Sequence, residues 1–421
     1  MYINPSVNRI TVNNNESSTG FVFFLFCLWA FVILSRPQDL FPVLGQFRPA
    51  LTMGILTMGF VVLRLKDLPG PPLFQERQIK YYTAFLLVMV LGIPFASHVR
   101  LAFESVFPTY IYVIIFVFIF YKLVSSIRRL YTVLLVSCLG SGLYSAVSLI
   151  NYEMGRLRFG GMFDPNDIAF FTLGFLPLNL IFISRDNPFW VRFACLCFFA
   201  MGVLLILLTG SRGGFLAFIA VTALLLLLKT RTVVPPIKVA FAVMCMVFLS
   251  VFTIDAERYK SILNLEDDYN IQLADEGGGR MGLWKFGMRA MLDNPLSGVG
   301  VGGSPRARFL DQQEFERRDL AYRPMHNSVV QIGAETGVIG FALFLFLCLN
   351  VVRIFNRARK MASNEKLVKI GEMGIIGFIG LFISGFFLTH GYSFYFVFYF
   401  VTSAIVSQLL VKEQISESRP A

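Results

Sequence analysis

The residue best placed to do chemistry is His326, one of three histidines in the 421 residues. Asn327 follows it, and after nine further residues comes Gly337-Val338-Ile339-Gly340. An imidazole changes charge near neutral pH, so it is suited to take a proton from a hydroxyl group. Because the pair stands directly before an apolar segment, the sequence predicts a titratable base at the mouth of a membrane helix.

Helical spacing relates this histidine to the residues that follow it. Positions 326, 330, 333, 337 and 340 fall on one helix face, and three of the five are glycine. Such a face predicts close approach of another backbone. Asn327, Gln331 and Glu335 form a second, polar stripe, which we expect to face the bundle interior or a wet cavity. Glu335 fits either a catalytic acid or a buried, hydrogen-bonded structural acid.

Arginines in separate segments supply the complementary charge. Arg212 lies in the short turn Thr209–Gly214, and Arg280 opens an amphipathic stretch. Earlier in the chain, Arg158 precedes the apolar segment 167–184. A guanidinium group binds phosphate oxygens through a bidentate fork, although arginines at span ends also reach lipid phosphates. The residues favour a site for an anionic lipid headgroup, in which arginines neutralise a leaving pyrophosphate and His326 accepts the proton of an acceptor hydroxyl.

The remaining titratable and sulfur-bearing residues suggest no further chemistry. His390, in a short turn between the last two apolar segments, is expected to have a surface or packing role, and His98 an interfacial one. All six cysteines fall in apolar segments, which argues against disulfides and a thiolate metal site. The acidic run Glu266–Asp268 lacks a histidine partner. We therefore expect no metal and no cofactor, and no glycine-rich segment matches a nucleotide-binding loop.

The elements that must position these residues are membrane helices. Hydrophobic residues make up 56% of the chain and charged residues 15%, which is improbable for a water-soluble protein of this length. The fold class predicted is an all-α polytopic membrane protein of about twelve transmembrane helices, with ten to twelve as the range. The predicted spans are 19–35, 50–65, 81–98, 102–121, 131–150, 167–184, 190–209, 214–228, 238–253, 328–350, 370–388 and 391–411.

Charge asymmetry predicts the orientation. With twelve spans, the connections on the side of the termini carry eighteen lysines and arginines, against six in the short connections on the other side. Both termini are thus expected in the cytoplasm. The net charge of +11 then reflects topology and gives no reason to expect nucleic-acid binding. The start of the chain lacks a cleavable signal pattern, so we expect the first span to be retained.

One long interruption divides the chain. Residues 1–252 are expected to form N-terminal transmembrane helices, 253–325 a large outer loop, and 326–421 C-terminal transmembrane helices. Within the loop, the spacing of Met281, Trp284, Met288 and Met291 predicts an interfacial amphipathic helix over 280–292, with Trp284 at the lipid headgroup level. Asp293-Asn294-Pro295 ends that helix, and a glycine-rich stretch follows. A basic segment with Arg306, Arg308, Arg317, Arg318 and Arg323 leads to His326.

Between residues 156 and 340 the sequence resembles the O-antigen ligase and polymerase family of integral-membrane glycosyltransferases. The matching parts are Leu208–Gly214, then Arg280 with Trp284 and the run Asp293–Gly300, and finally His326-Asn327 with Glu335–Gly340. Arg158 and Asn166 match a further family element of unassigned role. The N-terminal third, with Arg36-Pro37-Gln38-Asp39, offers no comparable match.

The resemblance implies a GT-C-like fold with a large periplasmic loop in the bacterial inner membrane. It also implies transfer of a glycan from an undecaprenyl-pyrophosphate carrier to an acceptor sugar such as lipid A core, with inversion and without a metal. By position, Arg212 and Arg280 would hold the pyrophosphate and His326 would activate the acceptor. Three alternatives stay open: a polymerase that elongates lipid-linked repeat units, a protein O-glycosylation ligase, and, from another class, a lipid or glycan transporter or flippase.

Overall fold

The computed structural model describes residues 16–151, 164–232, 280–305, 307 and 324–418. Within these ranges the regular structure is helical and no strand occurs, which confirms the all-α prediction. The helices are α1 Gly20–Ser35, α2 Pro37–Leu40, α3 Pro49–Leu63, α4 Arg77–Leu91, α5 Val99–Glu104, α6 Tyr110–Leu123, α7 Ile127–Ile150, α8 Pro165–Asn179, α9 Phe189–Leu208, α10 Arg212–Leu227, α14 Arg280–Asp293, α16 Ser328–Met361, α17 Glu365–Gly385 and α18 Phe394–Glu417.

Ten helical stretches in the described part of the chain are long and apolar enough to cross a membrane. The shorter apolar helix α10 matches the span predicted over 214–228. The span predicted over 238–253 and the loop boundary at residue 253 lie outside the described residues. A polytopic membrane protein is therefore confirmed.

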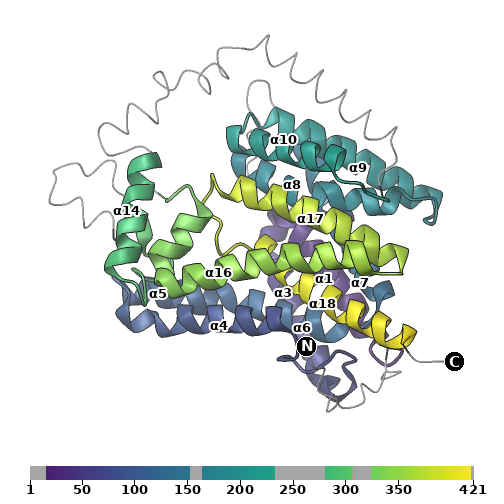
Figure 1. Ribbon diagram of the computed structural model, residues 1–421, viewed down its shortest axis with the longest axis horizontal. Helices are drawn as coiled ribbons and strands as arrows, with labels where there is room; N and C mark the ends of the chain where they lie inside the picture. Colours follow the sequence, from purple (N-terminus) through teal and green to yellow (C-terminus); the bar gives the residue numbers. More distant parts are fainter. Residues whose placement is uncertain (1–15, 152–163, 233–279, 306, 308–323, 419–421) are drawn as a thin grey trace, which may run out of the picture.

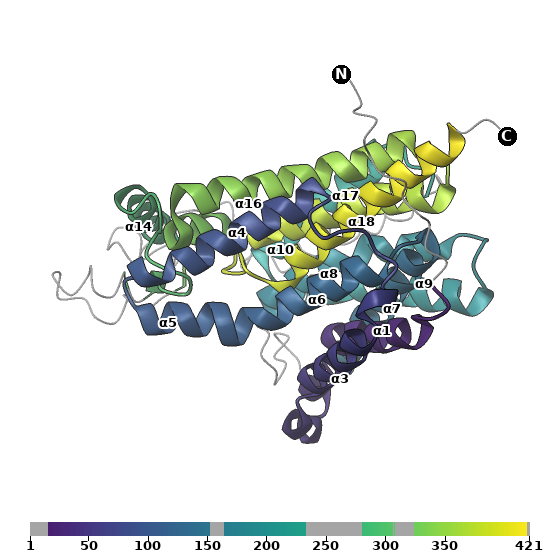
Figure 2. The same ribbon diagram turned by 90° about the horizontal axis from the view of Figure 1, so that it is seen from below.

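Helices α17, α8 and α18 form the centre of the bundle (Figure 1). Helix α17 packs against α16, α8 and α10, while α1 packs against α7 and α3. In the apolar stretches that contain α8 and α18, 83% of the span is buried inside the protein. In the stretch that contains α3, the buried share is 17%. Helix α3 stands away from the bundle (Figure 2), so its apolar side chains are left to the membrane.

The bundle has two polar ends. One end, which we call the site end, carries the turn before α10, the first turn of α8, helix α14, the start of α16 and the turn between α17 and α18. The other end carries the turn between α8 and α9, the end of α10 and the start of α17.

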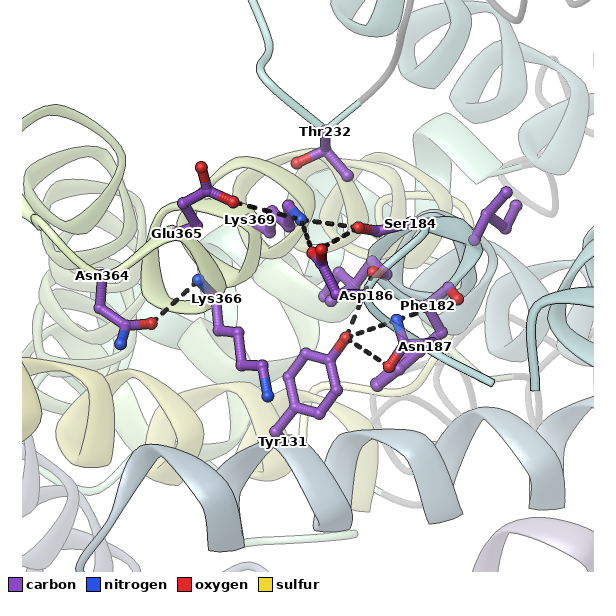
Figure 3. Close-up of polar contacts among 12 residues, drawn as sticks. Tyr131, Phe182, Ser184, Asp186, Asn187, Thr232, Asn364, Glu365, Lys366 and Lys369 are labelled. Atoms are coloured by element: carbon purple, nitrogen blue, oxygen red, sulfur yellow. Dashed lines mark hydrogen bonds and ion pairs between the residues drawn. The ribbon is translucent and has the colours of Figure 1, made fainter. Parts of the chain in front are cut away.

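Lys369 fastens helix α17 to the α8–α9 turn at the opposite end (Figure 3). Its Nζ lies 2.9 Å from both the Ser184 hydroxyl and a carboxylate oxygen of Asp186. Hydrogen bonds from Ser184 and Lys369 lower the pKa of Asp186 below its usual range. Close by, Tyr131 and Asn187 are hydrogen-bonded to each other, which joins α7 to the same turn.

Glu372 makes a second fastening at this end. Its buried carboxylate accepts hydrogen bonds from the backbone N–H groups of Arg231 and Thr232, at 2.8 and 2.9 Å, and from the Thr232 hydroxyl. A buried carboxylate is stable only when such donors surround it. The segment that follows α10 is thereby held against α17.

Candidate functional site

His326 lies just before helix α16 rather than on its face. The helix begins at Ser328, and Asn327 is its N-cap, accepting hydrogen bonds from the N–H groups of Val329 and Val330 at 2.9 and 3.1 Å. His326 has a φ of 47°, the left-handed region that non-glycine residues rarely adopt. The predicted place at the mouth of a helix is confirmed, whereas the expectation that residue 326 shares the glycine face is wrong, because the N-cap turns the chain away from the helix axis.

Helix α16 is interrupted at Gly337, where φ is 70° and ψ is −171°. The chain turns sharply there, and the segment before the break leads into the longer segment at a steep angle (Figure 1). A break in a helix releases backbone groups that need new partners. The prediction of one continuous face through positions 337 and 340 is therefore wrong.

Segment 294–300, which follows α14, supplies those partners. The N–H groups of Val299 and Gly300 donate to the carbonyl oxygens of Ala334 and Glu335, at 2.8 and 3.1 Å. In the reverse direction, the N–H of Val338 donates to the carbonyl oxygen of Pro295 at 2.8 Å. The two sequence motifs 293–300 and 335–340 thus form one structural unit.

Glycine is required where these backbones meet. A Cβ atom on Gly337 would lie 2.4 Å from the carbonyl oxygen of Pro295, and one on Gly298 would lie 2.5 Å from that of Ala334. Gly333 and Gly287 allow α16 and α14 to cross closely, since a Cβ on Gly287 would lie 2.4 Å from Val330. Close backbone approach to the glycine-rich face is confirmed. Gly340 differs, because the atom nearest to an added Cβ would be Thr336 Oγ1 on the same helix.

The polar stripe of α16 faces the bundle interior, as expected. Asn327, Gln331 and Glu335 are all buried. The Glu335 carboxylate accepts hydrogen bonds from the Ser304 hydroxyl at 2.6 Å and the Gly302 N–H at 2.9 Å. These contacts tie the glycine-rich stretch after α14 to α16, so the geometry favours the structural acid among the two interpretations of Glu335.

Helix α14 packs against α16 through Gly287 and Met291, so only part of the predicted methionine stripe is exposed. Leu283, Gly287 and Ala290 are buried, whereas Met281 and Met288 are about half exposed, at 54% and 49%. The ring of Trp284 makes an edge-to-face contact with Phe386, with centroids 6.0 Å apart. Trp284 thereby connects α14 with the end of α17, and the exposed methionines remain available to a membrane interface.

The two described arginines of the candidate site each begin a helix. Arg212 is the first residue of α10, where the Ser211 hydroxyl accepts a hydrogen bond from the Gly214 N–H at 3.1 Å. Arg280 is the first residue of α14. A helix N-terminus carries a partial positive charge, which adds to that of the guanidinium group. Both positions thus suit an anionic ligand.

The turn Phe386–Gly391, between α17 and α18, brings the separate motifs together. Phe386 contacts Trp284 of α14, and Phe387 packs so closely on Gly213 of α10 that a Cβ there would lie 2.7 Å away. The Thr389 hydroxyl oxygen accepts a hydrogen bond from the His326 N–H at 2.9 Å. The elements that carry Arg212, Arg280 and His326 therefore meet at one turn.

His390 in this turn is the residue whose surroundings the sequence analysis missed. Its Nε2 lies 2.7 Å from Oδ1 of Asp167, in the first turn of α8. The imidazole stacks on the ring of Phe170, in keeping with the expected packing role, but the sequence did not predict the hydrogen-bond partner, which lies 223 positions away along the chain. The only local signal was Asp164-Pro165-Asn166-Asp167, a helix start with a carboxylate at its third position.

The other predicted site residues contribute less to this geometry. Asn166 lies in the first turn of α8, and its backbone N–H donates to the capping Asp164 carboxylate at 2.7 Å. Arg158 lies outside the described residues, as do Arg306, Arg308, Arg317, Arg318 and Arg323 of the basic segment.

Comparison with known proteins bears on what these motifs are. Residues 196–345, which include Arg212, Arg280 and His326, match the family described as O-antigen ligase. This segment is therefore similar to the O-antigen ligase family. The resemblance seen in the motifs is thereby confirmed.

Two proteins similar to part of the chain come from Rickettsia, and both are named as putative polysaccharide ligases. The one from Rickettsia typhi is 24% identical over 156 residues, which is 36% of each chain. The one from Rickettsia conorii is 25% identical over 140 residues, which is 32% of each chain. The matches thus span about a third of the length of these relatives. The His390–Asp167 pair lies outside residues 196–345.

Proposed function

We propose that the protein transfers a glycan from an undecaprenyl-pyrophosphate carrier to an acceptor sugar, with lipid A core as the acceptor. The observation that carries the proposal is that the elements bearing Arg212, Arg280 and His326, all within the O-antigen ligase match, meet at the Phe386–Gly391 turn. A base and two cationic helix starts at one end of a membrane bundle suit a lipid-linked anionic donor.

In the proposed reaction the oxygen of the acceptor hydroxyl attacks C1 of the donor sugar. The bond between C1 and the pyrophosphate oxygen breaks, its electron pair leaves with the lipid pyrophosphate, and the hydroxyl proton passes to the His326 imidazole. Attack from the face opposite the leaving group inverts the configuration at C1. Arg212 and Arg280 stabilise the charge that develops on the pyrophosphate, and Arg158 is proposed to assist them.

The site end is proposed to face the periplasm across the bacterial inner membrane. The charge asymmetry of the connections supports this orientation. At the periplasmic face the donor is a lipid-linked glycan, and the proposed chemistry calls for neither a nucleotide sugar nor a divalent metal. The exposed methionines of α14 are proposed to rest on the membrane surface.

The test is an assay with purified full-length protein, undecaprenyl-pyrophosphate-linked glycan and lipid A core, in the presence and absence of EDTA. Glycan attached to lipid A core, undiminished by EDTA, is the expected result. Longer chains that remain on undecaprenyl pyrophosphate would instead identify a polymerase. Failure to form either product would overturn glycan transfer to these acceptors and direct the search to protein acceptors or to transport.

A further inference from the structure

Asp167 and His390 form a partly buried pair at the site end that the proposed reaction leaves without a role. Their side chains are 19% and 26% exposed, and Nε2 of His390 lies 2.7 Å from Oδ1 of Asp167. The imidazole also stacks on the ring of Phe170, with centroids 4.9 Å apart and planes 17° from parallel. Ring stacking and the hydrogen bond together fix both the position and the orientation of the imidazole.

Asp167 is itself held in place by the start of α8. It forms a capping box with Asp164: the Asp167 N–H donates to Oδ1 of Asp164 at 2.9 Å, and the Asp164 N–H donates to Oδ2 of Asp167 at 3.2 Å. One carboxylate oxygen of Asp167 therefore accepts a hydrogen bond from the start of α8, and the other is hydrogen-bonded to His390. The pair anchors the Phe386–Gly391 turn to the first turn of α8.

Every residue from Leu388 to Gly391 is hydrogen-bonded to the start of α16. Ser328 donates its hydroxyl to the Leu388 carbonyl oxygen at 2.9 Å and accepts from the His390 N–H at 3.0 Å. The Gly391 N–H donates to the Gln331 side chain at 3.0 Å. These hydrogen bonds involve the residues on both sides of Thr389, which accepts the hydrogen bond from the His326 N–H.

The backbone of His326 needs such support. Its φ of 47° is unfavourable for a residue with a Cβ atom, so surrounding contacts must hold it. The Thr389 hydroxyl bonds directly to the His326 N–H, and Thr389 is adjacent in sequence to the anchored His390. Displacement of the turn would therefore release the backbone that aims the His326 imidazole.

We propose that Asp167 and His390 are positioning residues, which hold the Phe386–Gly391 turn so that His326 keeps its left-handed conformation. The significance of that conformation for catalysis rests on the proposed function of His326. In this role His390 acts as a hydrogen-bond donor to Asp167 through Nε2, and the imidazole takes no proton from the substrate.

Two substitutions of His390 separate positioning from proton transfer. The amide nitrogen of glutamine is separated from Cα by the same number of bonds as Nε2, so His390→Gln keeps a donor that reaches Asp167. The amide nitrogen of asparagine is one bond closer to Cα, so His390→Asn does not reach Asp167. Neither side chain titrates near neutral pH.

In the glycan-transfer assay with full-length protein, we expect His390→Asn to lower kcat at least tenfold, about 1.4 kcal/mol of transition-state stabilisation, while KM for the lipid-linked donor changes less than threefold. His390→Gln should recover at least a third of the wild-type kcat. A His390→Gln variant as slow as His390→Asn would overturn the proposal, because the imidazole itself would then be needed. Full activity in both variants would overturn it equally.

A second measurement does not depend on activity. With three histidines in the chain, ¹⁵N-histidine labelling gives an NMR spectrum that single substitutions can assign. The His326 backbone amide signal should shift in His390→Asn and stay in place in His390→Gln. An unchanged His326 signal in His390→Asn would overturn the positioning role even if the protein transferred no glycan at all, whereas a shift without transfer would leave positioning intact and reject the proposed function.

Thr389 offers the same comparison should His390→Asn fail to fold. Thr389→Ser keeps the hydroxyl that accepts the His326 N–H, and Thr389→Val removes it with little change in shape. The valine variant should reproduce the loss in kcat and the shift of the His326 signal, and the serine variant should not. Equal behaviour of the two would overturn the proposal.

Discussion

At the scale of single residues, His326 combines an unfavourable backbone conformation with a hydrogen bond to Thr389 that supports it. A non-glycine residue in the left-handed region costs about 1 to 2 kcal/mol, and His326 is one of three such residues in the described chain, with Arg36 and Arg48. Functional sites often retain this kind of strain where neighbouring structure holds it. Of these three residues, His326 is the one that lies within the segment matching the O-antigen ligase family.

Replacing His326 by asparagine should abolish most glycan transfer without a large loss of stability. Asparagine adopts the left-handed region more readily than other non-glycine residues, so His326→Asn removes the imidazole without added backbone strain. Loss of a general base lowers the rate by about 10²- to 10⁴-fold. The measurement is kcat in the purified assay, together with thermal unfolding in detergent.

His98→Asn is the matched control. His98 is the N-cap of α5, where its Nδ1 accepts a hydrogen bond from the Leu101 N–H at 3.0 Å, and asparagine is itself a favourable N-cap. This variant should keep wild-type kcat. Should His326→Asn also keep wild-type kcat, His326 would have no part in proton transfer.

Some site features could be predicted from the sequence because they depend on local spacing. The buried stripe Asn327, Gln331 and Glu335 follows from helical periodicity alone. The pairing of His390 with Asp167 could not be predicted, because it depends on how two helices distant in sequence pack side by side. Asp167 lies in a helix start, where an acidic residue is ordinarily part of a cap, and His390 lies in a short turn, so nothing in the sequence linked the two.

At the scale of elements, segment 294–300 and the break in α16 depend on each other. The sequence shows a glycine-rich stretch in each, but periodicity across positions 326–340 favours one continuous helix. The break becomes evident only with its partner, because Val299, Gly300 and Pro295 replace the hydrogen bonds that the interrupted helix lacks. Non-helical backbone inside a membrane protein is tolerated where such protein partners cover it.

Gly337→Ala should therefore destabilise the protein by about 2 kcal/mol or more. Position 337 has a positive φ, which is unfavourable for alanine. The added Cβ would also lie 2.4 Å from the carbonyl oxygen of Pro295. Because segment 294–300 must move to relieve the contact, glycan transfer should fall as well. Thermal unfolding in detergent and kcat measure the two effects.

The control for this substitution is Gly59→Ala in α3. An added Cβ there meets nothing within 4 Å, and alanine favours a helix over glycine by about 0.5 to 1 kcal/mol. The Gly59 variant should be as stable as the wild type or slightly more so. Wild-type stability of Gly337→Ala would show that the break in α16 is not required.

At the scale of the whole molecule, the two ends of the bundle are held together by different means. At the site end, backbone hydrogen bonds and glycine contacts join α14 and segment 294–300 to α16, and hydrogen bonds of uncharged side chains add the Phe386–Gly391 turn. At the opposite end, charged side chains of α17 fasten its neighbours. Stability and transfer should therefore respond separately to substitutions at the two ends.

Glu372→Ala tests this separation. It removes a buried carboxylate and leaves the N–H groups of Arg231 and Thr232 without their acceptor, which should cost about 2 to 3 kcal/mol. The unfolding temperature in detergent should fall while kcat of the folded protein stays within twofold of wild type. Glu365→Ala, whose side chain is 78% exposed on the same helix, should leave both unchanged. An unaltered unfolding temperature for Glu372→Ala would contradict the fastening role.

The membrane orientation of the two ends decides whether the site can reach a periplasmic donor. Leu296 is 73% exposed in segment 294–300 at the site end, and Arg185 is exposed in the α8–α9 turn at the opposite end. In intact cells, a membrane-impermeant thiol reagent should label Leu296→Cys and leave Arg185→Cys unlabelled, whereas inverted vesicles should reverse the pattern. Four of the five described native cysteines are buried, so background labelling should be low, and the parent protein measures it.

Labelling of Arg185→Cys from outside would show the opposite topology, because the charge-rich connections would then face the periplasm against the expected bias. The base and the arginine-bearing helix starts would in that case open to the cytoplasm, and a periplasmic transfer reaction would be excluded.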